Sequence, residues 1–155
     1  MEGLIMPREN YVVIDFQDVA LQDRVKEVST LHGMFSWIIE GSGFFDVRER
    51  TSSNGNPDHY LYAYELNTHK FAVRLTLAKP ASRISYAPEY PTEGAGGLAN
   101  AAALVHLSND STATVSTEAG NLYIDYTAPA ELSIKSVDFL MSSRGTALDN
   151  IKLYE

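Results

Sequence analysis

Apolar and polar residues alternate along much of this chain with a period of two. The clearest example is the segment 71–77, in which every odd position is apolar and Arg74 and Thr76 stand at even positions. Successive side chains of a β-strand point to opposite faces. The segment is therefore predicted to be a strand with one face in a core and one polar face.

Further segments rich in β-branched and aromatic residues lie between turn-forming residues, and no long amphipathic helix competes with them. The predicted strands are residues 11–16, 35–40, 44–50, 60–66, 71–77, 83–87, 103–107, 113–117, 122–126, 132–141 and 151–154. Residues 20–31 carry a weak helical pattern. Short strands between frequent turns are typical of antiparallel sandwiches. We therefore predict an all-β fold, a two-sheet antiparallel β-sandwich of the jelly-roll type, with residues 1–155 as a single domain.

Local patterns refine this fold. Within residues 132–141 the apolar face moves from even to odd positions, which predicts a β-bulge near Lys135 and Ser136. Residues 52–58 contain Asn, Gly and Pro, which favour a hairpin loop or a longer connection. Residues 87–103 are rich in Pro, Gly and Ala, and we expect a long surface loop there, a common position for binding residues.

Composition narrows the classes of partner. The 155 residues suffice for one core, and 12 Lys plus Arg against 20 Asp plus Glu give a net charge of -8. This charge opposes a phosphate backbone, so no nucleic acid partner is expected. No apolar run approaches the ~20 residues of a membrane span. The absence of cysteine excludes disulfides and thiolate zinc sites. Residues 1–10 do not have the pattern of a secretion signal, and the localisation is open.

Both ends of the chain carry a recognisable motif. The stretch 136–155 contains Leu-Asp-Asn-Ile-Lys-Leu at 148–153, and residues 12–18 read Val-Val-Ile-Asp-Phe-Gln-Asp. These stretches resemble the closing and opening strands of bacterial extracellular jelly-roll domains of the carbohydrate-binding-module type. The resemblance implies that the first and last strands lie together, and that the protein is extracellular and binds carbohydrate.

The same resemblance implies a structural calcium ion held by Asp15, Asp18 and Asp149. Calcium takes about 6 to 8 oxygen ligands, and three carboxylates from two adjacent strands would supply about half of that shell. This chain has Gln17 where the family more often has a carboxylate, which lowers the charge of the site. In the alternative interpretation, Asp15 and Asp149 cap strand ends or accept hydrogen bonds from backbone amides.

Tyrosines supply the candidate binding chemistry. The candidate ligand-binding residues are Tyr60, Tyr62, Tyr64, Arg74, Tyr86 and Tyr90. The first three share one face of a predicted strand, and aromatic rings of this kind stack on the C–H faces of sugars. Arg74 adds polar contacts if its face adjoins the tyrosines, and the last two flank a proline turn. In the competing interpretation, the tyrosines fill the core or shield a sheet. Trp37 is expected in the core.

Motifs for catalysis are missing from the sequence. The histidines are scattered, and neither His-Glu-x-x-His nor Gly-x-Ser-x-Gly occurs. The predicted function is that of a non-catalytic carbohydrate-binding domain with a glycan or polysaccharide as its partner. The alternatives are a structural or assembly sandwich that acts through protein contacts, with a possible homo-oligomer, and a calcium-dependent membrane-binding sandwich.

Overall fold

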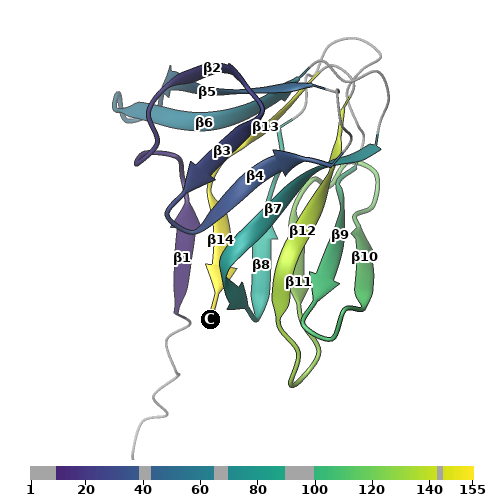
Figure 1. Ribbon diagram of the computed structural model, residues 1–155. Helices are drawn as coiled ribbons and strands as arrows, with labels where there is room; N and C mark the ends of the chain where they lie inside the picture. The colour runs from purple at the N-terminus through teal and green to yellow at the C-terminus, as the bar shows by residue number, and fades with distance from the viewer. Residues whose placement is uncertain (1–9, 39–42, 65–69, 90–99, 143–144) are drawn as a thin grey trace, which may run out of the picture.

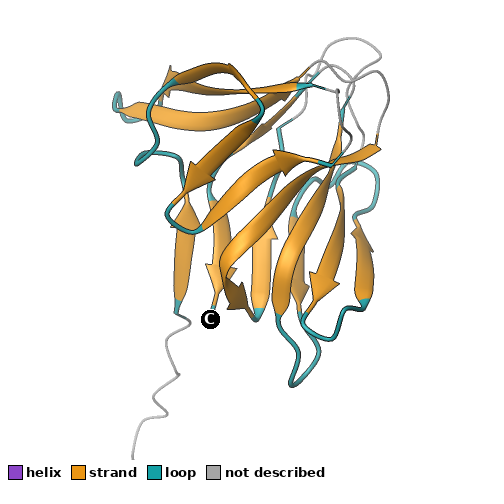
Figure 2. Cartoon of the chain, in the orientation of Figure 1, coloured by secondary structure: helices purple, strands orange, loops and turns teal. Residues whose placement is uncertain are grey.

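The computed structural model describes residues 10–38, 43–64, 70–89, 100–142 and 145–155, and these ranges form strands and loops without a helix (Figures 1 and 2). This part of the chain accordingly offers no helix that could cross a membrane. The strands are β1 (Tyr11–Ile14), β2 (Gln22–Val25), β3 (Glu27–Thr30), β4 (Gly33–Trp37), β5 (Phe44–Thr51), β6 (Pro57–Tyr64), β7 (Lys70–Ala81), β8 (Arg83–Tyr86), β9 (Ala102–Leu107), β10 (Thr112–Ser116), β11 (Ile124–Thr127), β12 (Ile134–Met141), β13 (Thr146–Leu148) and β14 (Ile151–Tyr154).

One layer is a six-stranded antiparallel sheet with the order β10-β9-β12-β7-β4-β3, and Figure 1 shows its strands side by side. Alternate residues of these strands are apolar and fully buried, among them Phe35, Leu75 and Phe139. Arg74 and Asp138, at the intervening positions, lie opposite each other on the outer face. The alternation predicted for residues 71–77 is therefore confirmed.

The other layer contains two four-stranded antiparallel sheets, β1-β14-β8-β11 and β13-β6-β5-β2. Only Asp149 and Asn150 separate β13 from β14, and Asn150 has a φ of 52°. β13 pairs with β6, and β14 pairs with β1 and β8. A bridge between Glu89 and Ala147 continues the line of β8 along β13. The two sheets are therefore joined through one interrupted strand and form a single layer.

Apolar residues of all three sheets meet between the layers. The ring of Phe35 lies 5.4 Å from that of Phe16 and 6.3 Å from that of Phe139. Leu61 and Phe45 contribute from the sheet that contains β5 and β6, and both are 0% exposed. The predicted antiparallel sandwich is confirmed, with three hydrogen-bonded sheets where two were expected.

Several local predictions can be checked against this fold. The register of β12 shifts between Ile134 and Ser136 against both neighbouring strands, which confirms the predicted bulge. β1 pairs with β14, as the resemblance implied. Trp37 is partly buried and stacks on Phe45 at 5.0 Å, as expected of a residue at the core. The short helix that the pattern of residues 20–31 suggested does not form, because β2 and β3 occupy that segment.

The predicted connection at residues 52–58 is the turn of the hairpin formed by β5 and β6. The Ser52 hydroxyl donates to the Asn56 carbonyl oxygen at 2.9 Å, and Gly55 has a φ of 85°, a conformation that favours glycine. This hairpin carries the residues of the candidate site.

Candidate functional site

Three tyrosines form a ridge on the outer face of β6. Leu61 and Ala63, which alternate with them, are 0% and 1% exposed and belong to the core. Tyr60, Tyr62 and Tyr64 therefore point away from the core, and each of them is partly exposed. The rings of Tyr62 and Tyr64 stack with a centroid distance of 5.5 Å. We call these three residues the tyrosine ridge.

Cationic side chains lie over the rings of this ridge. The guanidinium of Arg48 is 4.2 Å from the centroid of Tyr62, and that of Arg50 is 4.6 Å from Tyr60. Both arginines come from β5, where Arg48 pairs with Tyr60 across the hairpin. Phe44 extends the row, with its ring 6.2 Å from that of Tyr64. The outer face of this hairpin therefore combines aromatic rings with positive charge, although the whole chain is negative.

The buried Asp46 carboxylate fixes the position of the Arg48 guanidinium. It is 4% exposed, and it accepts two hydrogen bonds from Arg48, at 2.9 and 2.7 Å, and one from the Tyr64 hydroxyl at 2.8 Å. Burial alone raises the pKa of Asp46, but hydrogen bonds from the Arg24 N–H, Arg48 and Tyr64 outweigh it and lower the pKa below 3.8. Burial and the Asp46 carboxylate raise the pKa of Tyr64 to about 12, so its hydroxyl stays a donor.

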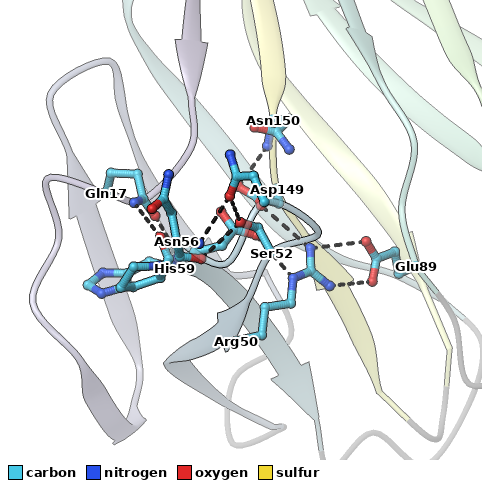
Figure 3. A network of polar contacts seen from close by, with 11 residues as sticks. Gln17, Arg50, Ser52, Asn56, His59, Glu89, Asp149 and Asn150 are labelled. Atoms are coloured by element: carbon cyan, nitrogen blue, oxygen red, sulfur yellow. Dashed lines mark hydrogen bonds and ion pairs between the residues drawn. The ribbon is translucent and has the colours of Figure 1, made fainter.

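Arg50 connects the ridge to a group of carboxylates (Figure 3). Its guanidinium donates to both oxygens of Glu89, at 2.8 and 3.1 Å, and to Asp58 at 3.1 Å. A longer contact of 3.5 Å reaches Asp149. Hydrogen bonds from Arg50 to Glu89 are the main cause that raises the pKa of Arg50 above its ordinary value. The arginine is therefore a permanent cation among three acidic side chains.

Asp149 is the most perturbed of these acids. It is 9% exposed, and burial, followed by the charge of Asp58 and a hydrogen bond shared with it, raises the pKa of Asp149 to about 7. The Asn150 N–H, which donates to Asp149 at 2.9 Å, and the charge of Arg50 act in the opposite direction. Near neutral pH this carboxyl group is therefore divided between its protonated and ionised forms.

The other two predicted calcium ligands accept hydrogen bonds from backbone amides. Asp15 accepts one from the Gln17 N–H at 3.1 Å, and Asp18 accepts one from the Leu31 N–H at 3.4 Å. Within the described ranges, no group of three or more acidic, histidine or cysteine side chains has a geometry that could hold a metal ion. Calcium stays a prediction.

The Gln17 side-chain amide both donates and accepts a hydrogen bond, which a carboxylate in its place could not do. Its Nε2 donates to the Pro57 carbonyl oxygen at 3.1 Å, while its Oε1 accepts from the His59 N–H. A carboxylate has no donor. Gln17 therefore ties the turn after β1 to the start of β6.

Arg74 does not join the tyrosines. It lies on the outer face of the six-stranded sheet, where it donates to both oxygens of Asp138, at 2.7 and 3.0 Å. His106 contacts the same carboxylate at 2.7 Å. Burial raises the pKa of Asp138, but the hydrogen bonds from Arg74 and His106 outweigh it and hold the pKa below 3.8. Arg74 therefore belongs to a separate ion pair, in which the Asp138 side chain is buried and the Arg74 side chain is 38% exposed.

The remaining two candidates lie elsewhere. Tyr86 is 3% exposed, and its ring stands edge-on to that of Phe139 in the core, with centroids 5.0 Å apart. Tyr90 lies outside the described residues. The candidate site therefore keeps the tyrosines of β6 and, through Arg50, gains contact with Asp149.

The cations and the buried carboxylate of this face were not among the predicted site residues. A signal for them was present, since Asp46, Arg48 and Arg50 alternate with Phe45 and Val47 in a predicted strand. That pattern predicts a charged outer face. Which of these charged residues lies beside which tyrosine depends on the register of the β5–β6 hairpin. Alternation within a single strand does not define that register.

A scan of the chain against models of known families found no match, and neither did searches among curated proteins and solved structures. The function is therefore inferred from the chemistry of the site.

Proposed function

We propose that this protein is a non-catalytic carbohydrate-binding module that binds a glycan on the tyrosine ridge. The observation that carries the proposal is the row of three outward tyrosines with arginines over two of them. An outer face that served only to shield a sheet would need neither an ordered row of phenols nor a buried carboxylate to hold a guanidinium above it.

The chemistry of this row suits a sugar. The parts of the rings that the guanidinium groups and the Tyr62–Tyr64 stack leave uncovered offer apolar surface to the C–H faces of a pyranose. Phenol hydroxyls and guanidinium N–H groups bond to its hydroxyls. Arg48 has five N–H donors, and its side chain is 45% exposed. Asp46 accepts one hydrogen bond from Nε and one from Nη2, and the Tyr60 side chain shares a further hydrogen bond with Arg48. Donors therefore remain for a ligand on an arginine that is already ordered, which lowers the entropy cost of binding.

The proposal is tested by affinity electrophoresis through gels that contain neutral or uronate-bearing polysaccharides. The wild-type protein should be retarded by at least one polysaccharide, and Tyr60→Ala and Tyr62→Ala should each reduce the retardation. Tyr11→Ala is the matched control, because Tyr11 is 48% exposed on a different sheet, and its retardation should equal that of the wild type.

Tyr60→Phe separates loss of binding from loss of fold, since it keeps the ring and should keep most of the retardation. Normal mobility of the wild-type protein in every gel, or equal retardation of the wild type and both alanine variants, would contradict the proposal. The alternative of assembly through protein contacts stays a prediction.

A further inference from the structure

A hollow lies beside the break between β13 and β14, away from the residues of the ridge. It measures about 260 Å³ and lies among β8, β14 and the residues before β11. Its chemistry comes from six side chains, namely Ser85, Glu89, Tyr123, Asp149, Asn150 and Lys152. Arg50 connects it to the ridge, because this arginine bonds to Glu89 and lies over Tyr60.

The interruption between β13 and β14 positions this hollow. Asn150 takes a left-handed conformation, with a φ of 52°, which asparagine tolerates better than most residues. Its N–H donates to the Asp149 carboxylate instead of to a neighbouring strand. The break in the ladder places a carboxyl group and an amide side by side at the hollow.

The charges around the hollow compensate one another. Arg50 donates to both oxygens of Glu89 and also contacts Asp149, and Lys152 adds a second cation to the lining. A site whose charges are matched internally gains little from a charged ligand, whereas the exposed Asn150 amide can donate to and accept from a neutral hydroxyl.

The size and the aromatic wall define the ligand further. Ligand sites for drug-sized molecules span about 300–1,000 Å³, so a hollow of about 260 Å³ suits something smaller. Tyr123 lines it and is 52% exposed, so its ring is accessible to a ligand. A pyranose has a C–H face for this ring and a rim of hydroxyls for the polar groups opposite.

We propose that this hollow is a second binding site, which takes one neutral pyranose ring with Tyr123 against its C–H face. The choice of a sugar rests on the proposed function, but the site is separate from the ridge.

The test is a titration of the ¹⁵N-labelled protein with the methyl glycosides of glucose, galactose, mannose and N-acetylglucosamine, followed by amide chemical shifts. At least one of these glycosides should cause saturable shifts at Ser85, Tyr123, Asn150 and Lys152. Tyr123→Ala should weaken that binding about five- to tenfold, and Tyr123→Phe should preserve it. Leu21→Ala is the control, since Leu21 is a large apolar side chain that is 54% exposed and does not line the hollow.

Absence of saturable shifts with all four glycosides would overturn the second site, as would equal affinity of the wild type and Tyr123→Ala. Binding of glucosamine or glucuronate in preference to the neutral sugars would also overturn it. Retardation by a polysaccharide without any shift at the hollow refutes this inference alone. Shifts at the hollow without retardation in any gel refute the ridge alone.

Discussion

Replacement of Asp149 by asparagine should stabilise the protein at alkaline pH and leave its stability almost unchanged in acid. The Asp149 carboxyl group is buried beside Asp58, and its pKa is raised from an ordinary 3.8 to about 7. Between about pH 4 and pH 7 the folded state therefore holds a proton that the unfolded state has lost, and stability falls as the pH rises through this window.

The magnitude follows from the same rise in pKa. At about 1.36 kcal/mol per pH unit, a rise from 3.8 to about 7 corresponds to at most about 4 kcal/mol of lost stability above pH 7. Asparagine has the shape of the protonated acid and keeps an acceptor for the Asn150 N–H. We therefore expect Asp149→Asn to be more stable than the wild type by about 1–4 kcal/mol at about pH 8, and by less than about 1 kcal/mol at about pH 4.

The assay is urea denaturation at several pH values, followed by the fluorescence of the single tryptophan, Trp37, which is partly buried against the core. The quantity of interest is the difference in the free energy of unfolding between variant and wild type. A difference that stays constant from about pH 4 to pH 8 would refute the reasoning, as would a variant less stable than the wild type at the alkaline end.

Three further substitutions and a calcium titration each test a different part of the structure. Asp138→Asn should destabilise the protein by about 1–3 kcal/mol at neutral pH, because it removes a buried carboxylate that bonds to the partly exposed side chains of Arg74 and His106. Since the pKa of Asp138 is lowered, the loss should shrink as the pH falls below about 4, and denaturation at the two pH values checks this. Gly145→Ala should cost about 1–3 kcal/mol, because φ is 114° and a Cβ would lie 2.3 Å from the Tyr62 hydroxyl. Gly55→Ala, which meets open space, should cost about 1 kcal/mol, and equal losses in thermal denaturation would contradict the geometry. Calcium at its three predicted ligands should raise the melting temperature only at about millimolar concentrations, because Arg50 already contacts one of them, and an unchanged melting temperature would remove that proposal.

Much of the fold could be predicted from alternation, because most strands have one face in the core. β2 was missed because Gln22–Val25 is an edge strand with a single apolar residue. β13 was missed because its three residues are all buried and show no alternation. The bulge in β12 was predictable, since a bulge must shift the apolar phase by one residue.

The site could be predicted only in part. Three tyrosines two residues apart on one strand must share a face, so the ridge was visible in the sequence. The hollow joins Ser85, Tyr123 and Asn150 from segments far apart in the chain, and the proximity of such segments depends on strand order. Arg74 was assigned to the tyrosines on the assumption that adjacent predicted strands pair, whereas β6 and β7 belong to different sheets.

The most direct test of glycan binding on the ridge is the spectrum of the protein with ¹³C-labelled tyrosine rings, recorded during titration with oligosaccharides from the polysaccharide that retards it most. The ring signals of Tyr60, Tyr62 and Tyr64 should move together and saturate, while that of Tyr11 stays in place. Movement of the Tyr11 signal with the three ridge signals unchanged would contradict the proposed binding face.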